Sequence, residues 1–373
     1  MNTSISRRGF AKILGTTAAY AALRPALSAS APSLRLLKAE RGTAVVRLSS
    51  NENPYGPSPM ALKAMTEAFD LAWRYPDDHE QALVEALAKL HGVASEKILL
   101  GNGSGEIIKI AAAAFTGSGR KVVVSNPTFE AILAHARTAQ AEVVKIDLTP
   151  DYAHDLNRML GTTNAAGLVY LCNPNNPTAS ITPKDQIRAF LEKVPVQTVV
   201  LIDEAYHHYV ETNDYESAIP LLKQHPNLIV ARTFSKVYGM AGLRCGYCVA
   251  QPELIQRMRS QQTWDSVNIM ALVAANASLQ DGAQVAEGRR RNSEVKKFIY
   301  SELDRSGFKY IPSQANFLMI DLRREVKPVI AALRERNVQV GRVFPALPNF
   351  MRVTIGTRPQ MDTFVSAFRS VMS

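Results

Sequence analysis

Cysteine is scarce in this 373-residue chain, and its scarcity excludes a disulfide-stapled fold. Only three cysteines are present, Cys172, Cys245 and Cys248, an odd number too small for a disulfide framework. Cys245 and Cys248 have C-x-x-C spacing, but they lie in an apolar run that predicts a strand. Positions three apart on a strand face opposite ways. We therefore interpret all three as core thiols with no redox or metal role.

The chain also lacks internal repeats, low-complexity segments and, beyond its N-terminus, any apolar run of the ~18 residues that a spanning helix needs. Hydrophobic residues make up 46% of the sequence and charged residues 20%, which is typical of a soluble globular protein. The length suffices for one large domain and a smaller one.

Acidic residues are absent from residues 1–31, which carry four of the ten net positive charges of the chain. The remaining excess of +6 is dispersed. The one dense cluster, Arg289-Arg290-Arg291, lies in a helical pattern with Glu287 and Glu294 and lacks interleaved aromatic residues. This pattern predicts a solvated helix face, and we expect no nucleic-acid partner.

The N-terminal segment has the pattern of an export signal. Ser6-Arg-Arg-Gly-Phe-Ala-Lys12 resembles the twin-arginine signal, and an apolar stretch, Pro25 and small residues to Ala31 follow it. We expect residues 1–31 to direct a folded, cofactor-loaded protein to the periplasm, with no stable membrane association after export. The alternative is a basic amphipathic helix that stays attached, in a protein that remains cytoplasmic.

Short apolar strands alternate with helical patterns through the middle of the chain. The expected strands are 98–100, 122–125, 141–146, 168–172, 198–202, 228–232 and 245–250. Alternation of this kind predicts an α/β fold with a mainly parallel sheet, whose ligands bind beyond the carboxyl ends of the strands. We expect an extended arm at 32–60, a large domain at 61–264 and a smaller α+β domain at 265–373.

Unusual polar loops follow four of these strands. They are Gly101-Asn-Gly-Ser-Gly-Glu106, Asn173-Pro-Asn-Asn-Pro-Thr178, Asp203-Glu-Ala-Tyr206 and Thr233-Phe-Ser-Lys236. The glycine turn offers free N–H groups at a helix start, an anion site, although a simple tight turn is the alternative.

Lys236 has uncharged neighbours, so it can lose its proton at low cost and act as a nucleophile toward aldehydes. Hydroxyls at Thr233 and Ser235, with Arg244, suit a phosphate dianion. An amine beside a phosphate cradle predicts a site for pyridoxal phosphate (PLP). The alternative is a surface lysine in a glycine-rich loop.

The order and spacing of N-P-N-N-P-T, D-E-A-Y and S-K with Arg244 eight residues on resemble the fold-type I, PLP-dependent aminotransferases of class I/II. Within that group the chain looks most like the histidinol-phosphate aminotransferase branch. The resemblance covers residues 48–373. It implies an aspartate aminotransferase-like large domain that binds PLP, amino-acid and 2-oxo-acid substrates, and a homodimer.

The resemblance also implies a role for each matching residue. Lys236 would form the Schiff base with PLP and shuttle a proton, and Asp203 would pair with the pyridine nitrogen. Tyr206 and Asn176 would bond the ring hydroxyl, and Phe129 would stack on the ring, unless it is only a core aromatic. The implied phosphate ligands are Ser104, Gly105, Glu106, Thr233, Ser235, Arg244 and, reaching the partner subunit's cofactor, Tyr75.

For the substrate, the resemblance implies that Arg352 grips the carboxylate. Asn53, Tyr55 and Phe344 are expected to line the pocket, although Tyr55 has the alternative of merely packing the arm. Arg342, in Val340-Gly-Arg-Val-Phe-Pro345, departs from the family's V-R-P pattern, so the arginine that senses the far end of the substrate is shifted. Ala179 replaces the glycine of N-P-T-G, a change we expect to be tolerated at a negative φ.

These residues predict an aminotransferase that moves an amino group between an amino acid or amino-alcohol phosphate, histidinol-phosphate- or aromatic-like, and a 2-oxo acid such as 2-oxoglutarate. One alternative is a decarboxylase, lyase or racemase on the same scaffold. Another is a non-catalytic binding protein, although residues 1–50 show no helix-turn-helix pattern. We expect no metal site, since His207 and His208 are adjacent and have no third ligand at a sensible spacing.

Overall fold

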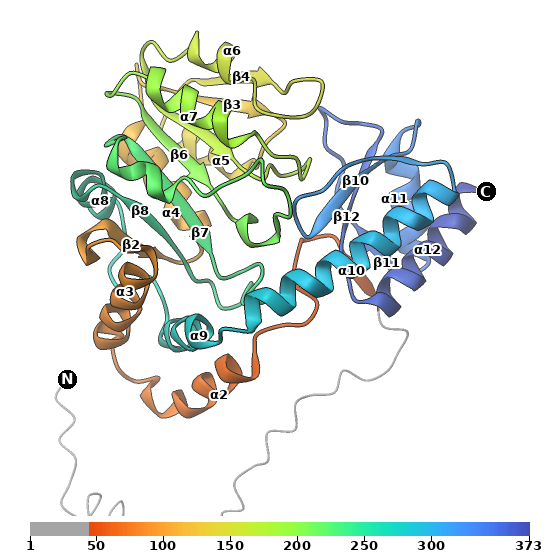
Figure 1. The fold of residues 1–373 in the computed structure, drawn as a ribbon, viewed down its shortest axis with the longest axis horizontal. Coiled ribbons are helices and arrows are strands. Elements are labelled where there is room, and N and C mark those ends of the chain that lie inside the picture. The colour runs from red at the N-terminus through yellow and green to blue at the C-terminus, as the bar shows by residue number, and fades with distance from the viewer. Residues whose placement is uncertain (1–44) are drawn as a thin grey trace, which may run out of the picture. The chain divides into compact units, whose positions relative to one another are not determined.

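A seven-stranded sheet is central to the computed structural model, which describes residues 45–373 (Figure 1). Its order is β2-β8-β7-β6-β5-β3-β4. The strands are β2 (Ile98–Gly101), β3 (Lys121–Asn126), β4 (Val143–Asp147), β5 (Ala166–Cys172), β6 (Val199–Asp203), β7 (Leu228–Thr233) and β8 (Gly246–Ala250). Strands β3 to β7 run parallel, and β8 is antiparallel to both neighbours. The predicted α/β fold is confirmed.

Helices cover both faces of this sheet, which is why its central strands are apolar throughout and not alternating. Every residue of β5, β6 and β7 is buried. One face packs against α4 (Ser104–Phe115), α5 (Ala131–Thr138) and α8 (Pro252–Arg259). The other packs against α3 (Asp77–His91), α7 (Lys184–Lys193) and α9 (Ile269–Gln280). The short helices α2 (Pro59–Glu67) and α6 (Leu156–Leu160) lie at the edges of that second layer.

A second core forms around the C-terminal strands. Strands β9 (Lys309–Ile311), β10 (Phe317–Asp321) and β12 (Phe350–Thr354) make an antiparallel sheet, backed by α10 (Gln284–Arg305), α11 (Val326–Glu335) and α12 (Arg358–Met372). The arm contributes β1 (Val46–Leu48), which pairs in parallel with β11 (Val338–Val340). Residues Val45–Ser373 form one unit, so the boundary expected at residue 264 stays a prediction.

The arginine cluster lies on α10 as an ion-paired helix face. Arg290 bonds both Glu287 and Glu294, and Arg291 bonds Glu287 at 2.6 Å. None of the helices from residue 45 onward is long and apolar enough to cross a membrane. The expected signal at 1–31 and the first part of the arm, residues 32–44, lie outside the described residues.

A buried ion pair joins the ends of β6 and β7 next to the residues of the site. Arg232 donates to Oε2 of Glu204 from Nε at 3.0 Å and from Nη2 at 2.8 Å. The side chains are only 8% and 1% exposed, respectively. Glu204 follows Asp203 and Arg232 precedes Thr233, and neighbouring residues of extended chain face opposite ways. The pair therefore holds both strand ends from behind while Asp203 and Thr233 face the site.

Candidate active site

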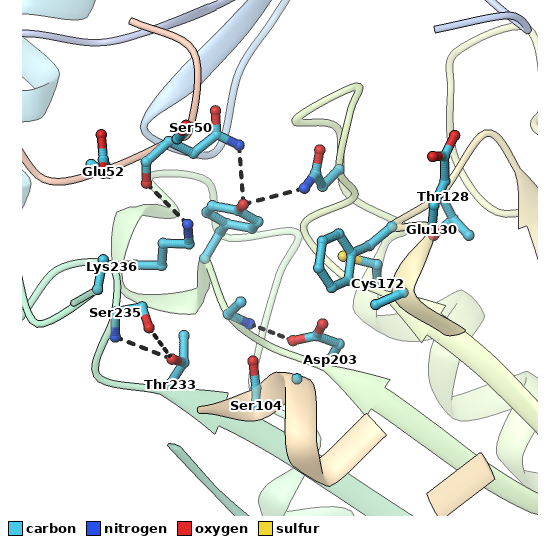
Figure 2. A pocket seen from close by; sticks show the side chains of 18 of the residues that line it. Ser50, Glu52, Ser104, Thr128, Glu130, Cys172, Asp203, Thr233, Ser235 and Lys236 are labelled. Carbon is cyan, nitrogen blue, oxygen red and sulfur yellow. Dashed lines mark hydrogen bonds between the residues drawn. The ribbon is translucent and has the colours of Figure 1, made fainter. Parts of the chain in front are cut away.

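A cavity of about 440 Å³ opens at the carboxyl ends of the parallel strands (Figure 2). Twelve of the sixteen predicted site residues line it. They are Ser104, Gly105, Phe129, Asn176, Asp203, Tyr206, Thr233, Ser235, Lys236, Arg244, Arg342 and Arg352. Phe344 lines it as well. The sheet thus brings together side chains that are up to 248 positions apart in the sequence, from Ser104 to Arg352.

Lys236 projects into this cavity from the turn after β7. Its Nζ donates to the backbone oxygen of Asn51 at 3.0 Å and lies 5.3 Å from the ring centroid of Tyr206. Burial, and then the charge of Arg352, lower the pKa of this amine to about 8, although Asp203 acts in the opposite direction. A larger fraction of Lys236 than of an ordinary lysine is therefore neutral near physiological pH and able to attack an aldehyde.

Asp203 lies across the same cavity and is 2% exposed. Its Oδ2 accepts a hydrogen bond from the Tyr170 hydroxyl at 2.9 Å, and its Oδ1 accepts one from the Ala205 N–H at 3.1 Å. Burial raises the pKa of the carboxyl to about 6, and the bond from Tyr170 limits the rise. A cationic ring nitrogen would supply the opposite charge that this buried acid lacks, and would keep the acid ionised.

The glycine turn before α4 is packed closely enough to form an anion cradle. A Cβ on Gly103, which has φ +75°, would overlap the guanidinium of Arg244, and one on Gly246 would overlap the backbone of Gly103 and Ser104. The N–H groups of Ser104 and Gly105 are the first of α4, where a helix has no internal acceptors for them. These donors, with Arg244 beside them, suit a phosphate.

The hydroxyl groups of Thr233 and Ser235 hold each other in place beside the cradle. Thr233 Oγ1 donates to Ser235 Oγ at 2.9 Å and accepts from the Ser235 N–H at 3.1 Å. Arg244 reaches Ser235 Oγ at 3.4 Å and adopts a left-handed backbone with φ 64°. Strained conformations of this type cluster where a side chain must be aimed at a ligand.

The structure corrects the role expected for Glu106. Its carboxylate accepts hydrogen bonds from the Asn102 N–H at 2.6 Å and from Ser266 Oγ at 2.8 Å, and its own N–H donates to the Gly103 oxygen. Glu106 does not line the cavity. The residue holds the glycine turn in place and has no donor left for a phosphate.

Three further predicted residues lie outside the cavity within this chain. The amide of Asn53 donates to the Val237 oxygen at 2.8 Å. Tyr55 packs under the guanidinium of Arg291, 4.7 Å from the ring centroid, which favours the alternative that it packs the arm. The side chain of Tyr75 is 80% exposed.

Arg352 is held for an anion that the protein itself does not supply. Its Nη1 donates to Asn176 Oδ1 at 2.7 Å and its Nη2 to the Ser49 oxygen at 2.8 Å. Its Nε is buried yet has no hydrogen-bond partner among residues 45–373. Because a buried unsatisfied donor is costly, this arrangement is typical of a guanidinium that completes its bonding with a substrate.

The condition under which alanine was expected to be tolerated at position 179 is not met, because the φ of Ala179 is +60° and not negative. The residue is fully buried, its N–H donates to the Asn175 oxygen at 2.7 Å, and its oxygen accepts from the Gln314 N–H at 2.8 Å. A left-handed conformation costs a non-glycine residue ~1 kcal/mol or more. The hydrogen bonds on both sides hold the loop in that conformation despite the added methyl group.

Sequence reasoning missed several residues of the cavity wall. Asn51, at φ 55°, donates to the Tyr206 hydroxyl at 3.1 Å and accepts the bond from Lys236. Its signal was available, because asparagine tolerates the left-handed region and stands in a proline-rich arm. Tyr170 gave no such signal, since its ring is an ordinary core aromatic until the hydroxyl is seen to face Asp203.

The histidines do not form a metal site. His207 and His208 stack edge to face with ring centroids 5.0 Å apart, and burial lowers the pKa of His207 to about 3. In the part of the chain that the structure describes, no group of three His, Cys, Asp or Glu side chains could hold a metal ion.

Known proteins are similar to this chain in sequence and in fold. Residues 43–368 match the family model of aminotransferase class I and II. Histidinol-phosphate aminotransferases of Moorella thermoacetica and Brevibacillus brevis are 41% and 37% identical over 88% and 89% of this chain, and 86% and 91% of theirs. The crystal structure of histidinol-phosphate aminotransferase from Sinorhizobium meliloti in complex with pyridoxal-5'-phosphate superposes with a TM-score of 0.84 and 27% identity, over 88% of this chain and 91% of that one.

The fold and the cavity define a PLP-dependent enzyme, since an amine, a buried acid and an anion cradle converge where that cofactor needs them. The chain belongs to the aminotransferase class I and II family and is a PLP-dependent transaminase. Bound here, PLP supplies an aldehyde and an electron-withdrawing ring.

The residues divide the remaining work among themselves. Asp203 would hold a proton on the ring nitrogen, and the start of α4 with Ser235 and Arg244 would bind the phosphate. Phe129 would cover one ring face, while Asn176 and Tyr206 would bond the ring oxygen. The Lys236 amine, whose pKa is lowered to about 8, can in its neutral form take a proton from the substrate carbon and return it.

Replacing Tyr170 by phenylalanine tests how Asp203 is kept ionised. Loss of the hydroxyl removes a donor that lowers the pKa of Asp203, so that pKa will rise further above its value of about 6. PLP binding requires the ionised carboxylate. When the pH is lowered, the variant will therefore lose PLP at a higher pH than the wild type does. We expect PLP affinity at pH 7 to fall about tenfold, as for a lost hydrogen bond to a charged group. Absorbance titrations of the cofactor-free protein between about pH 5.5 and 8.5 measure the effect.

Tyr209→Phe is the matched control, because Tyr209 is also buried but neither lines the cavity nor bonds Asp203. An unchanged PLP titration in Tyr170→Phe would show that Tyr170 does not support Asp203.

Proposed function

We propose that this transaminase moves the amino group of histidinol phosphate to 2-oxoglutarate. The observation that carries the proposal is the unpaired Nε of Arg352 in the cavity that holds Lys236 and Asp203. An amino acid and an amino-alcohol phosphate both present an anion beside the carbon that bears the amine. One guanidinium can therefore bind either substrate at the same place. The names of the sequence relatives support the same pair of substrates.

The geometry favours reactions that break the carbon–hydrogen bond, amino transfer among them, over decarboxylation. The bond that breaks is the one held perpendicular to the cofactor ring. By anchoring the substrate anion, Arg352 would keep that anion near the ring plane and leave the carbon–hydrogen bond perpendicular. The amine of Lys236 then receives the proton released. A bound anion that stays on the substrate is what transamination requires.

A half-reaction screen tests this proposal. The holoenzyme is mixed with histidinol phosphate, glutamate or aromatic amino acids, and the visible absorbance of bound PLP is followed. We expect histidinol phosphate and glutamate to bleach it, and 2-oxoglutarate to restore it. Lys236→Ala should lose at least about 10³-fold in rate, because no other lysine among residues 45–373 lines the cavity to carry the proton. Exposed Lys63 supplies the control, Lys63→Ala. Carbon dioxide released without any added oxo acid would instead indicate a decarboxylase.

We also propose that the enzyme is a homodimer in which Tyr75 completes the partner's phosphate site. Large apolar side chains are exposed near this segment: Trp73 is 74%, Tyr75 80% and Trp264 90% exposed. Tyr75 does not line the cavity of its own chain. Contiguous aromatic exposure of this kind is typical of a surface covered by another subunit.

Mixed dimers test the arrangement. Chains carrying Lys236→Ala and chains carrying Tyr75→Ala are coexpressed, and each variant is also purified alone. If Tyr75 acts across the interface, a hybrid has one intact site, and random pairing restores about a quarter of wild-type activity. No gain over the two separate variants, or a monomer in sedimentation equilibrium, would overturn the proposal.

For localisation, we propose export by the twin-arginine route to the periplasm. The support is the sequence pattern of residues 1–31 alone, with Arg7-Arg8 ahead of the apolar stretch. Cell fractionation of the tagged full chain should find it in the periplasm, shortened at its N-terminus, and Arg7→Lys with Arg8→Lys should retain it in the cytoplasm. Full-length wild-type protein confined to the cytoplasm would rule the signal out.

A further inference from the structure

Two arginines share one aromatic ring at the entrance of the cavity. The guanidinium carbon of Arg342 lies 4.3 Å from the ring centroid of Phe344, and that of Arg352 lies 5.1 Å from it. Phe344 is 3% exposed and so fixes both contacts. The two guanidinium carbons are therefore less than about 10 Å apart. A five-carbon dicarboxylate that pairs with a guanidinium at each end can span this separation.

The two arginines differ in what they bind inside the protein. Arg352 is largely buried and keeps its Nε without a partner, whereas the side chain of Arg342 is 52% exposed and has a carboxylate partner. Nη2 of Arg342 donates to Oε2 of Glu130 at 2.5 Å. Burial lowers the pKa of Arg352, and the charge of Arg342 lowers it further, which shows that the two charges are near one another.

Glu130 reaches this arginine from another part of the fold. It directly follows Phe129 at the start of α5, 212 positions before Arg342, and both side chains line the cavity. In Figure 2, Glu130 lies at the opposite side of the pocket from Lys236. Its side chain is 47% exposed, so it can swing into solvent. Ion pairs this exposed contribute little free energy, and an incoming anion can displace the glutamate.

We propose that Glu130 is a specificity-determining residue whose carboxylate stands in for the second acid of a dicarboxylic substrate. Glu130 occupies Arg342 while the bound substrate has no distal acid. Glu130 releases Arg342 when glutamate or 2-oxoglutarate brings a distal carboxylate that binds this arginine. The inference rests on the proposed function, because transamination makes one cavity accept two unlike substrates in turn. Without the stand-in, Arg342 would be an uncompensated charge facing every substrate that lacks a distal acid.

Binding of two matched acids to the holoenzyme tests the inference. Glutarate and pentanoate have the same chain length, but only glutarate has the second carboxylate. Calorimetric titration should show that E130Q binds glutarate about fivefold more tightly, because no internal carboxylate competes for Arg342. Pentanoate affinity should change less than about twofold. R342Q should lose about tenfold in glutarate affinity and approach its affinity for pentanoate.

The control is E216Q, which removes the same charge from an ion pair outside the cavity. Glu216 accepts two hydrogen bonds from Arg188, at 2.6 and 2.7 Å, and does not line the cavity. The ratio of glutarate affinity to pentanoate affinity of the E216Q variant should equal that of the wild type. In steady-state assays, E130Q should raise kcat/KM for glutamate relative to histidinol phosphate.

The possible failures are distinguishable. If E130Q leaves the affinity ratio unchanged while the enzyme still transaminates, the inference about Glu130 is wrong and the proposed function stands. If glutarate binds E130Q more weakly, Glu130 positions Arg342 for the ligand and does not compete with it. If no amine substrate is transaminated by the wild type, the proposed function itself fails, whatever the two acids do.

Discussion

A buried acid and a buried amine face one cavity without neutralising each other. Asp203 is bonded to Tyr170 and Ala205, whereas Lys236 is bonded to the oxygen of Asn51. The pKa of each group is therefore shifted toward neutral pH, that of the acid upward and that of the amine downward. A direct ion pair would reverse both shifts and leave neither group free for a cofactor. Much of the surrounding structure keeps these two groups apart.

Rigid supports behind the cavity maintain that separation. The Arg232–Glu204 pair joins the ends of β6 and β7, and removing one partner of such a buried pair typically costs ~3–5 kcal/mol. Left-handed backbone at Asn51, Ala179 and Arg244 occurs in three of the loops near the cavity. Local strain of this kind persists only where neighbouring contacts hold it, which is why it is found close to the site.

The entrance of the cavity is built on a different physical basis from its floor. At the floor, charges are buried and their partners fixed, so changes there affect whether chemistry occurs. At the entrance, Arg342 and Glu130 are about half exposed and exchange partners at little cost. An enzyme that must accept two substrates in succession can use the same catalytic groups at the floor of the cavity for both. The side chains at the entrance can then change partners from one substrate to the other. The transaminase reaction thus imposes opposite demands on two ends of the same pocket.

The amino-acid sequence alone determined most of the strands, their mainly parallel arrangement, the loops that carry Lys236, Asp203 and Asn176, and the strand that carries Arg352. It could do so because apolar runs, turn residues and the ends of parallel strands are local or follow from sheet geometry. Only the tertiary structure decided that Glu106 faces away, that Ala179 is left-handed, that Tyr170 bonds Asp203, and that Asn51 and Glu130 reach the cavity. Those outcomes depend on which partner each side chain contacts in the folded chain. A hydrogen bond between residues far apart in the sequence produces no periodic pattern in the sequence from which it could be predicted.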